Sequence, residues 1–348
     1  MSDFFPLTLN NVRNLTPDAV ELCLSVPDNL KETFAFKAGQ YITFRHTVGG
    51  TELRRAYSIA SAPGSSQLCV GVKKVDGGRF SVFANEALQE GDTLEVMPPQ
   101  GRFVFDPATN QNILAVAAGS GITPMMSIIR AALEQNQSSR VVLLFGNRSA
   151  REAMYLEEIR ELSQKYTDRF TYYFTFSREQ EADALFGRIE KSTLNFILKN
   201  KHVSETFDRY YLCGPQEMIE MCEVALGENG VAPEAILHEL FTEPDGESAV
   251  EGLAEGQSQV EIVLDEQTFT LTMSQKDVIL DAALKNKIDA PYSCQGGVCS
   301  TCIARVTEGS AKMAKNQILT DSEIEEGFVL TCQAHPTSAV VKVDYDDV

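Results

Sequence analysis

The spacing of apolar residues changes about one third of the way along the chain. Up to residue 107, short segments such as 20–26 and 39–44 alternate apolar and polar positions, and turn residues such as Pro63 and Gly64 separate them. A period of two is typical of strands with one buried face. Regularly spaced strands of this kind predict a small antiparallel β-barrel, and we assign residues 1–107 to it.

From residue 108 continuous apolar runs replace the alternation. Residues 113–118 form such a run, which is typical of a parallel strand covered on both faces. A helix is expected at 125–133, with Thr123 as its N-cap and Pro124 in its first turn. The remaining expected elements are strands at 141–145, 170–176 and 210–212 and a helix at 151–163. This alternation predicts an open parallel α/β sheet over residues 108–241, with ligands at the carboxyl ends of its strands.

The last third of the chain begins with a change in composition. Residues 242–257 are rich in Glu and Gly and poor in large apolar side chains, which predicts a flexible linker. After it, segments 260–264 and 268–272 predict a hairpin around Asp265 and Glu266, followed by a helix near 277–286. Residues 258–348 are therefore expected to form a further small domain.

Charge and hydropathy exclude several classes of function. The net charge of −19 argues against nucleic-acid binding, which requires a basic surface. Residues 251–348 carry 16 acidic against 7 basic side chains, so this region is the most acidic and could steer a basic partner. A merely solvated acidic face is the alternative. No secretory signal and no apolar run of roughly 18 residues is present, so we expect a cytoplasmic protein without a membrane span.

Four cysteines near the end of the chain have the spacing C-x4-C-x2-C…C: Cys294, Cys299, Cys302 and Cys332. This is the spacing with which four thiolates hold a 2Fe–2S cluster in plant-type ferredoxins. Gly296 and Gly297 allow the loop to turn its backbone N–H groups toward sulfur. A zinc site would need a second knuckle or histidines, and a disulfide framework is not expected without a secretory signal.

The other cysteines have simpler interpretations. Cys23, Cys69 and Cys222 stand among apolar residues, and we interpret them as small buried hydrophobic side chains.

Two motifs of the barrel resemble the flavin-binding signature of the ferredoxin–NADP reductase family. They are R-R-A-Y-S at 54–58 and G-G-R-F-S at 77–81. The resemblance implies that Arg55 neutralises flavin phosphate, Tyr57 packs on the isoalloxazine and Ser58 presents its hydroxyl near N5. Ala56, Gly78, Arg79 and Ser81 complete the flavin-binding set, with Gly78 and Ser81 opening a helix whose N–H groups hold pyrophosphate. FAD is the expected flavin, although the family also includes FMN proteins.

Two loops of the predicted parallel sheet resemble the nicotinamide-binding motifs of the same family. Gly119, Gly121, Thr123 and Pro124 belong to G-S-G-I-T-P, which is similar to the family pattern G-x-G-x-[ST]-P. Cys213, Gly214 and Pro215 match its C-G-P signature, in which the cysteine lies beside the nicotinamide. By itself, Cys213 would be interpreted as a core thiol.

Three residues indicate which nicotinamide nucleotide is bound. A 2′-phosphate requires arginine near the ribose. Ser177 and Arg178 follow a predicted strand and resemble the phosphate-binding segment of NADP-preferring relatives, and Arg148 follows another strand. We therefore expect NADPH, with solvated surface charges as the alternative.

The segment 238–241 closes the predicted reductase. It resembles the E-x-F of relatives that carry an appended ferredoxin, which implies that Phe241 covers the flavin and that the carboxylate of Glu239 lies near the reacting ring. The alternative is an ordinary final strand. The resemblance thus implies a reaction site containing Ser58, Cys213 and Glu239.

The resemblance spans the chain as an FAD-binding barrel, an NADP-binding domain and a C-terminal β-grasp ferredoxin domain. This order is that of reductase components of bacterial multicomponent oxygenases, which implies electron transfer from NADPH through FAD and the cluster to a partner oxygenase. The motifs look closest to the reductase subunits of phenylacetyl-CoA epoxidases, which implies a multisubunit diiron partner. They are shared with reductases of hybrid-cluster proteins and of other diiron hydroxylases or desaturases. A non-enzymatic, ferredoxin-like redox sensor is the alternative from another class.

Overall fold

The computed structural model describes residues 4–48, 50–241 and 256–348, which divide into two compact units. Phe5–Leu53 and Tyr57–Phe241 form the larger unit. The smaller unit comprises the described residues from 256 onward, together with Phe4 and Arg54–Ala56. Within the described residues no helix is long and apolar enough to cross a membrane.

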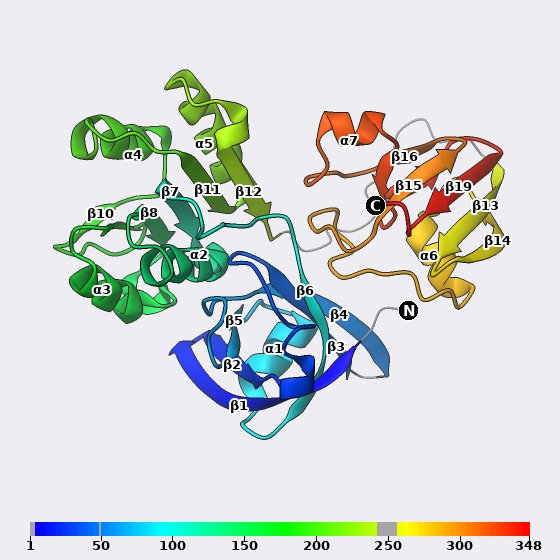
Figure 1. The fold of residues 1–348 in the computed structure, drawn as a ribbon, viewed down its shortest axis with the longest axis horizontal. Coiled ribbons are helices and arrows are strands. Elements are labelled where there is room, and N and C mark those ends of the chain that lie inside the picture. Colours follow the sequence, from blue (N-terminus) through cyan, green and yellow to red (C-terminus); the bar gives the residue numbers. More distant parts are fainter. Residues whose placement is uncertain (1–3, 49, 242–255) are drawn as a thin grey trace. The chain divides into compact units, whose positions relative to one another are not determined.

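The N-terminal region is an antiparallel barrel, as the alternation of apolar residues predicts. Its strands are β1 (Phe5–Thr16), β2 (Ala19–Ser25), β3 (Tyr41–Val48), β4 (Thr51–Ser58), β5 (Leu68–Lys73) and β6 (Thr93–Gln100). They form one sheet in the order β4-β3-β6-β1-β2-β5, and a bridge between Ile59 and Val70 joins its two ends. Helix α1 (Arg79–Glu86) lies against the barrel (Figure 1), where Phe80 and Ala84 pack into the core.

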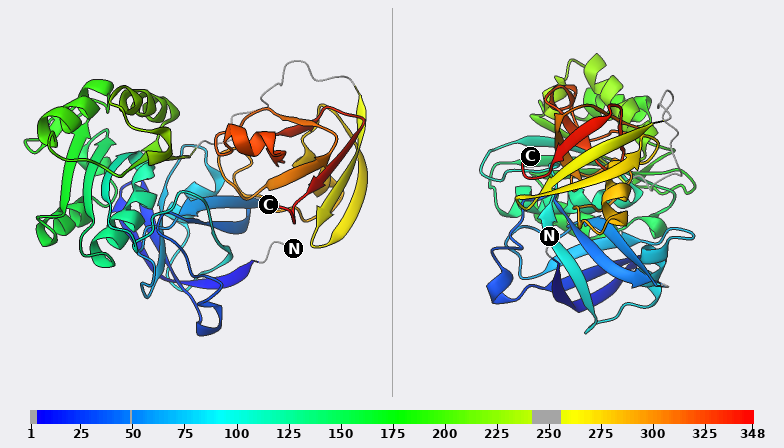
Figure 2. Two further views of the ribbon diagram at one scale, coloured as in Figure 1. Left: turned by 45° about the horizontal axis from the view of Figure 1, so that its top comes forward. Right: turned by 90° about the vertical axis from the view of Figure 1, so that its right-hand side faces the viewer.

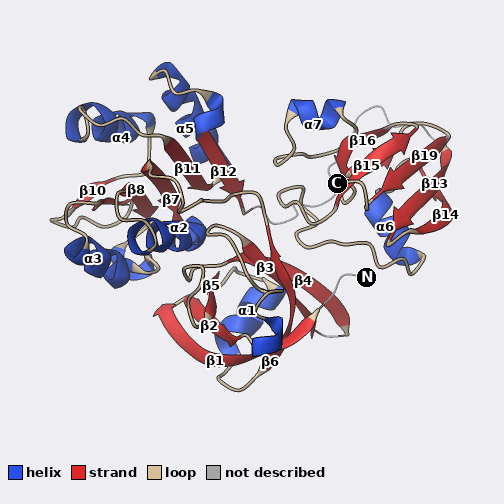
Figure 3. Ribbon diagram, viewed as in Figure 1, coloured by secondary structure: helices blue, strands red, loops and turns tan. Residues whose placement is uncertain are grey.

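The middle of the chain is a parallel sheet between helices. The strands are β7 (Asn112–Ala118), β8 (Arg140–Asn147), β9 (Phe170–Phe176), β10 (Ala184–Phe186), β11 (Arg209–Gly214) and β12 (Ile236–Leu240). The helices are α2 (Ile122–Glu134), α3 (Leu156–Lys165), α4 (Lys191–Phe196) and α5 (Gln216–Glu228). The strand order is β10-β9-β8-β7-β11-β12, with α2 and α3 on one face and α4 and α5 on the other (Figures 1 and 3).

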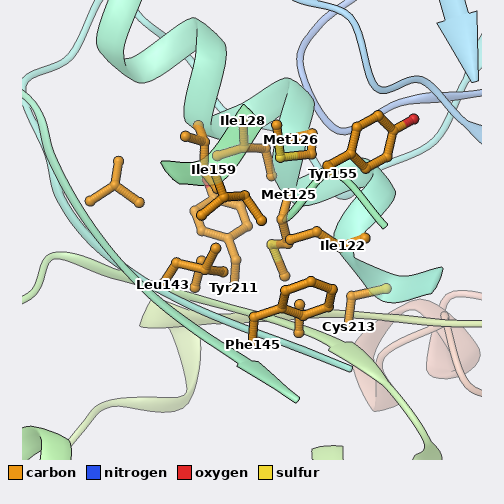
Figure 4. Close-up of a cluster of buried hydrophobic side chains, with 14 of the residues drawn as sticks. Ile122, Met125, Met126, Ile128, Leu143, Phe145, Tyr155, Ile159, Tyr211 and Cys213 are labelled. Atoms are coloured by element: carbon orange, nitrogen blue, oxygen red, sulfur yellow. The ribbon is translucent and has the colours of Figure 1, made fainter. Parts of the chain in front are cut away.

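One continuous core joins the barrel to this sheet. It contains the buried side chains of α2 and of the central strands, together with barrel residues such as Ala19, Ala38 and Phe105. Figure 4 shows Ile122 and Met125 of α2 packed with Phe145 and Cys213 of the sheet. This shared apolar core explains why the two regions form one compact unit.

The smaller unit contains the C-terminal mixed sheet (Figure 2). Its elements are β13 (Gln257–Leu264), β14 (Gln267–Ser274), α6 (Ile279–Lys285), β15 (Ile303–Glu308), β16 (Ala311–Met313), α7 (Asp321–Glu325), β17 (Phe328–Leu330), β18 (Ala334–Pro336) and β19 (Val340–Asp344). The main sheet has the order β14-β13-β19-β15-β17. Asp265 and Glu266 both have positive φ in the turn of the β13–β14 hairpin, as a tight two-residue hairpin turn requires.

Some predicted boundaries were wrong. Helix α2 begins at Ile122, so Thr123 lies in its first turn and is not the N-cap. The Thr123 hydroxyl instead donates to the carbonyl of Ser120 (2.9 Å), a local bond that competes with capping. Residues 242–255 of the predicted linker lie outside the described residues, and Gln257 already belongs to β13.

The interpretation of Cys23 and Cys69 as small buried side chains is confirmed for their burial but missed their covalent bond. These side chains form a disulfide between β2 and β5. The antiparallel register places the two residues directly opposite each other, although 46 positions separate them in the sequence. Strand register is a tertiary property, so the sequence spacing did not reveal the pair.

Candidate flavin, nucleotide and cluster sites

The centre of the parallel sheet is a topological switch point. From β7 the chain proceeds to β8 and β9 on one side, and later returns to β11 and β12 on the other. In open parallel sheets, ligands bind in the crevice beyond the carboxyl ends of the strands at such a point. Gly119–Gly121 follows β7, and Cys213 and Gly214 end β11, so the two predicted nucleotide motifs flank this position.

The glycines of these motifs permit close approach of the backbone. A Cβ at Gly121 would lie 2.6 Å from the carbonyl carbon of Cys213, and one at Gly214 would lie 3.2 Å from the Cβ of Ala118. Gly119 has a φ of +57°, a conformation that residues with side chains rarely adopt. The close approach of the two loops therefore requires glycine at position 121, where a side chain would collide with the backbone of Cys213.

The structure brings together the three residues predicted for the reaction site. The Ser58 hydroxyl donates to Oε2 of Glu239 over 3.0 Å. Glu239 on β12 is the register partner of Cys213 on β11. Ser58, Glu239 and Cys213 are 4%, 7% and 0% exposed, so the group is shielded from water.

The thiol of Cys213 is held in its neutral form. Burial raises its pKa well above the ordinary value, and the nearby charge of Glu239 raises it further. A thiol of this kind is a poor nucleophile. Its side chain is completely buried in the core beside α2, which does not favour covalent chemistry.

The predicted flavin-binding residues lie on β4 and at the start of α1. Arg55, Ala56 and Tyr57 belong to β4, where the Tyr57 ring packs 5.5 Å from that of Phe80. Gly78 precedes α1, and no side chain caps this end of the helix, which suits the binding of an anionic group. The Ser81 hydroxyl accepts a hydrogen bond from the Val75 N–H (3.2 Å), while Arg79 is exposed. The open helix end fits a flavin phosphate.

The residues predicted for the 2′-phosphate lie on adjacent loops. Arg148 follows β8, and Ser177 and Arg178 follow β9. The Arg178 N–H donates to the carbonyl of Arg148 (2.8 Å), which holds the two loops side by side. Sequence reasoning missed Glu179, whose carboxylate accepts from the Ala150 N–H (2.8 Å) and anchors the loop after Arg148.

The two remaining predicted residues lie at element ends. Pro215 is the N-cap residue of α5. Phe241 directly follows β12 and its side chain is 43% exposed, which leaves an aromatic surface two residues beyond Glu239.

The four predicted cluster cysteines converge in the smaller unit. Cys299, Cys302 and Cys332 are buried and Cys294 is half-buried. The neighbouring Cys299 thiol lowers the pKa of Cys294 below the ordinary thiol value, and Cys302 lies beside Cys332, which raises the pKa of Cys302. The Gly296 N–H also donates to the sulfur of Cys294 (3.3 Å). Four converging sulfurs, with one thiol predisposed to ionise, fit an iron–sulfur cluster.

Two supporting residues of this loop were not predicted. The Thr331 hydroxyl donates to the carbonyl of Cys302 (3.0 Å), and the Tyr345 hydroxyl donates to Thr331 (2.8 Å). Both side chains are buried. Neither belongs to a motif, and only the fold brings Tyr345 to the cluster loop.

Comparison with protein families supports each region. Residues 6–105 match an oxidoreductase FAD-binding domain, residues 115–223 an oxidoreductase NAD-binding domain, and residues 262–337 a 2Fe–2S iron–sulfur cluster binding domain. The cofactor types and the three-part fold predicted from the sequence are thereby confirmed.

Full-length relatives and solved structures share this arrangement. The chain is 37% identical to a 1,2-phenylacetyl-CoA epoxidase subunit of Escherichia coli, over 99% of both chains. It is 32% identical to the ferredoxin reductase component of the Rhodococcus rhodochrous 3-ketosteroid-9-alpha-monooxygenase, over 97% of this chain and 96% of the relative. Its fold matches that of phthalate dioxygenase reductase with a TM-score of 0.62 and 20% identity, over 98% of both chains.

Proposed function

The chain belongs to the family of oxygenase reductases that combine FAD-binding, NAD-binding and 2Fe–2S domains, and from this we propose that it transfers electrons from NADPH to a phenylacetyl-CoA epoxidase. The observation that carries the choice of partner is the 37% identity to the Escherichia coli epoxidase component along the whole chain. The domain limits proposed from the sequence are 1–107, 108–241 and 258–348, and each family match lies inside one of them.

The residues at the switch point position the nicotinamide. Gly121 and Gly214 let the dinucleotide backbone approach the sheet, and Cys213, buried directly beneath these glycines, supports the position of the ring from the core. Ser58 and Glu239, joined by a buried hydrogen bond, orient the reacting edge of the flavin. Bound FAD would supply two-electron hydride chemistry toward the nicotinamide and one-electron chemistry toward the cluster.

Arg55 and the open end of α1 hold the flavin in the barrel. The Arg55 guanidinium provides charge for a phosphate, and the start of α1 after Gly78 provides backbone donors. Tyr57 and Phe241 supply aromatic surface for the ring system, and the packing of Tyr57 against Phe80 limits its movement. Cys294, Cys299, Cys302 and Cys332 would hold the cluster.

We assign the preference for NADPH to Arg148 and Arg178. They extend from adjacent loops at one edge of the sheet, where two guanidinium groups can share a 2′-phosphate. Arg178→Ala should lower kcat/KM for NADPH about tenfold or more and leave that for NADH nearly unchanged, since a charge-assisted bond is worth about 1.5–3 kcal/mol. Arg140→Ala at the opposite end of β8 is the matched control. An equal loss for both nucleotides would contradict the assignment.

Reconstitution tests the proposed partner. Purified holoprotein is mixed with the catalytic subunits of a phenylacetyl-CoA epoxidase, and substrate-dependent NADPH consumption is followed together with formation of the epoxide. We expect consumption that depends on both components and on phenylacetyl-CoA. If the flavin and cluster are reduced but no product forms, the proposed partner is wrong, while the assignment as a reductase still holds.

An anaerobic spectral titration separates this function from that of a redox sensor. Flavin and cluster absorbance should both bleach on addition of NADPH, and to a smaller extent with equal NADH. A protein that contains the cluster and does not respond to either nucleotide would be a sensor and not a reductase.

A further inference from the structure

The disulfide between Cys23 and Cys69 has no role in the electron route described above. It joins β2 to β5 within the larger unit, and both side chains are buried. Cys222 and Cys213 are also buried in this unit but remain free thiols. The bridge is thus a distinct chemical feature of the barrel.

The disulfide lies on the outer face of the barrel, against the nucleotide-binding region. Side chains alternate along a strand, and the neighbours Leu22, Leu24, Leu68 and Val70 point into the barrel core. Ala19, on the same face of β2 as Cys23, packs in the core that contains α2. The bridge therefore lies at the junction of the two regions.

Hydrogen bonds connect Cys69 to helix α2. The Cys69 N–H donates to the Ser61 hydroxyl (3.1 Å), and the carbonyl of Cys69 accepts from the Ala60 N–H (2.8 Å). On the other side, the Ser127 hydroxyl donates to the carbonyl of Ser61 (2.7 Å), and Arg130 donates to that of Ala60 (2.6 Å). Ser127 and Arg130 belong to α2, the helix that begins at the nucleotide loop.

Strand β5 also contacts the nucleotide loop directly. Gly71, two residues after Cys69, lies so close to its neighbours that a Cβ there would be 2.7 Å from Cε of Met154 and 3.3 Å from Oγ1 of Thr123. Figure 4 shows Tyr155, the residue after Met154, at the edge of the same core. A displacement of β5 would therefore change the position of Thr123.

Ion pairs also link the barrel to the nucleotide-binding region at this junction. Glu21 lies two residues before Cys23, and one of its carboxylate oxygens lies within 4.8 Å of both sulfurs. Arg13 pairs with Glu21 (2.6 Å) and also with Glu158 of α3, which in turn pairs with Arg130. Both sulfurs are buried, which limits access of an exchanging thiol, so the two redox states should interconvert slowly.

We propose that Cys23 and Cys69 form a reversible redox site that controls the affinity of the protein for its nicotinamide nucleotide. In the disulfide state the bridge holds β2 and β5 together and keeps the 60–61 segment bonded to α2. In the dithiol state β5 gains freedom, and the first turn of α2 around Thr123 is less well ordered before nucleotide binds. Nucleotide affinity should therefore be lower in the dithiol state.

The chemistry needs only small molecules of common classes. Hydrogen peroxide oxidises the pair, so that two thiols and one peroxide give one disulfide and two waters. A small dithiol reverses this by exchange, so that the protein regains two thiols and the reductant becomes a cyclic disulfide. The proposal is independent of which oxygenase receives the electrons.

Thiol counting and nucleotide titration on the holoprotein test the proposal. Both samples are treated with dithiothreitol and desalted anaerobically. One of them is then reoxidised with stoichiometric hydrogen peroxide. After unfolding and alkylation, intact mass should show two fewer modified thiols in the oxidised sample. Titration with NADP+, followed by flavin difference absorbance, should give a dissociation constant about fivefold or more higher for the dithiol state, the low end of couplings between sites.

Two variants separate the pair from other thiols. The double variant Cys23→Ala/Cys69→Ala should bind NADP+ like the dithiol state under both treatments, whereas Cys222→Ala should respond like the wild type. Should the double variant not fold, the two wild-type states decide the question alone. Equal thiol counts, or equal dissociation constants for the two states, would overturn the proposal.

Discussion

The buried hydrogen bond between Ser58 and Glu239 makes the proposed hydride-transfer geometry testable. Ser58→Ala removes the hydroxyl that donates to Glu239 over 3.0 Å. A hydrogen bond to a charged group is worth about 1.5–3 kcal/mol, and each 1.36 kcal/mol of barrier is a factor of ten in rate. Flavin reduction by NADPH should therefore slow by a factor of about 10 to 150, because the carboxylate loses the donor that orients it.

Anaerobic stopped-flow absorbance at the flavin band measures this step separately from later electron transfer. The control Ser65→Ala removes an exposed hydroxyl of the same barrel that bonds only to the carbonyl of Gln67 in the described residues, and should leave the rate unchanged. Glu239→Gln and the double variant complete a cycle, in which the two effects should be clearly non-additive. Less than a twofold change in Ser58→Ala, or additive effects in the cycle, would refute the reasoning.

Three further outcomes are expected. In Gly121→Ala the added Cβ would collide with the Cys213 backbone, so the variant should be less stable by about 1–3 kcal/mol. It should also lose the stabilisation by NADP+ that is seen in thermal denaturation, and unchanged stabilisation would contradict this. Burial raises the pKa of Cys222 to about 12, so its contribution to stability is complete below the ordinary thiol pKa and is lost as pH rises toward 12. In urea titrations, Cys222→Ala should therefore flatten the fall in unfolding free energy above pH ~9. An identical fall in the variant and the wild type would argue against this assignment. Tyr345→Phe removes the donor to Thr331 and should lower the stability of the smaller unit by about 1 kcal/mol. The cluster should then bleach faster in excess chelator. The control Tyr173→Phe on β9 should bleach like the wild type.

The predicted elements were most accurate where the signal was local. The apolar run at 113–118 became β7, and the hairpin around Asp265 and Glu266 has the expected strands on both sides. Boundaries that depend on competing hydrogen bonds were less accurate. Thr123 shows this, because its hydroxyl bonds to the carbonyl of Ser120 and the helix starts earlier.

The residues of the candidate site could also be predicted from local motifs, whereas the contacts between them could not. Motifs identified its glycines, its arginines and the four cluster cysteines, because each is required by backbone geometry or ligand chemistry within a short segment. The contact between Ser58 and Glu239 spans 181 positions and arises only when β12 completes the sheet beside the barrel. Motif resemblance supplied the two residues, and tertiary structure supplied the bond between them.

The sequence by itself determined the three-part architecture, the cofactor types and the residues of each motif, because periodicity, glycine placement and thiol spacing are properties of short segments. Only the tertiary structure decided which distant residues meet. It joined Cys23 to Cys69, placed Tyr345 behind the cluster loop and made one core of the barrel and the parallel sheet. Such contacts depend on strand register and packing, which bring together positions that no local pattern relates.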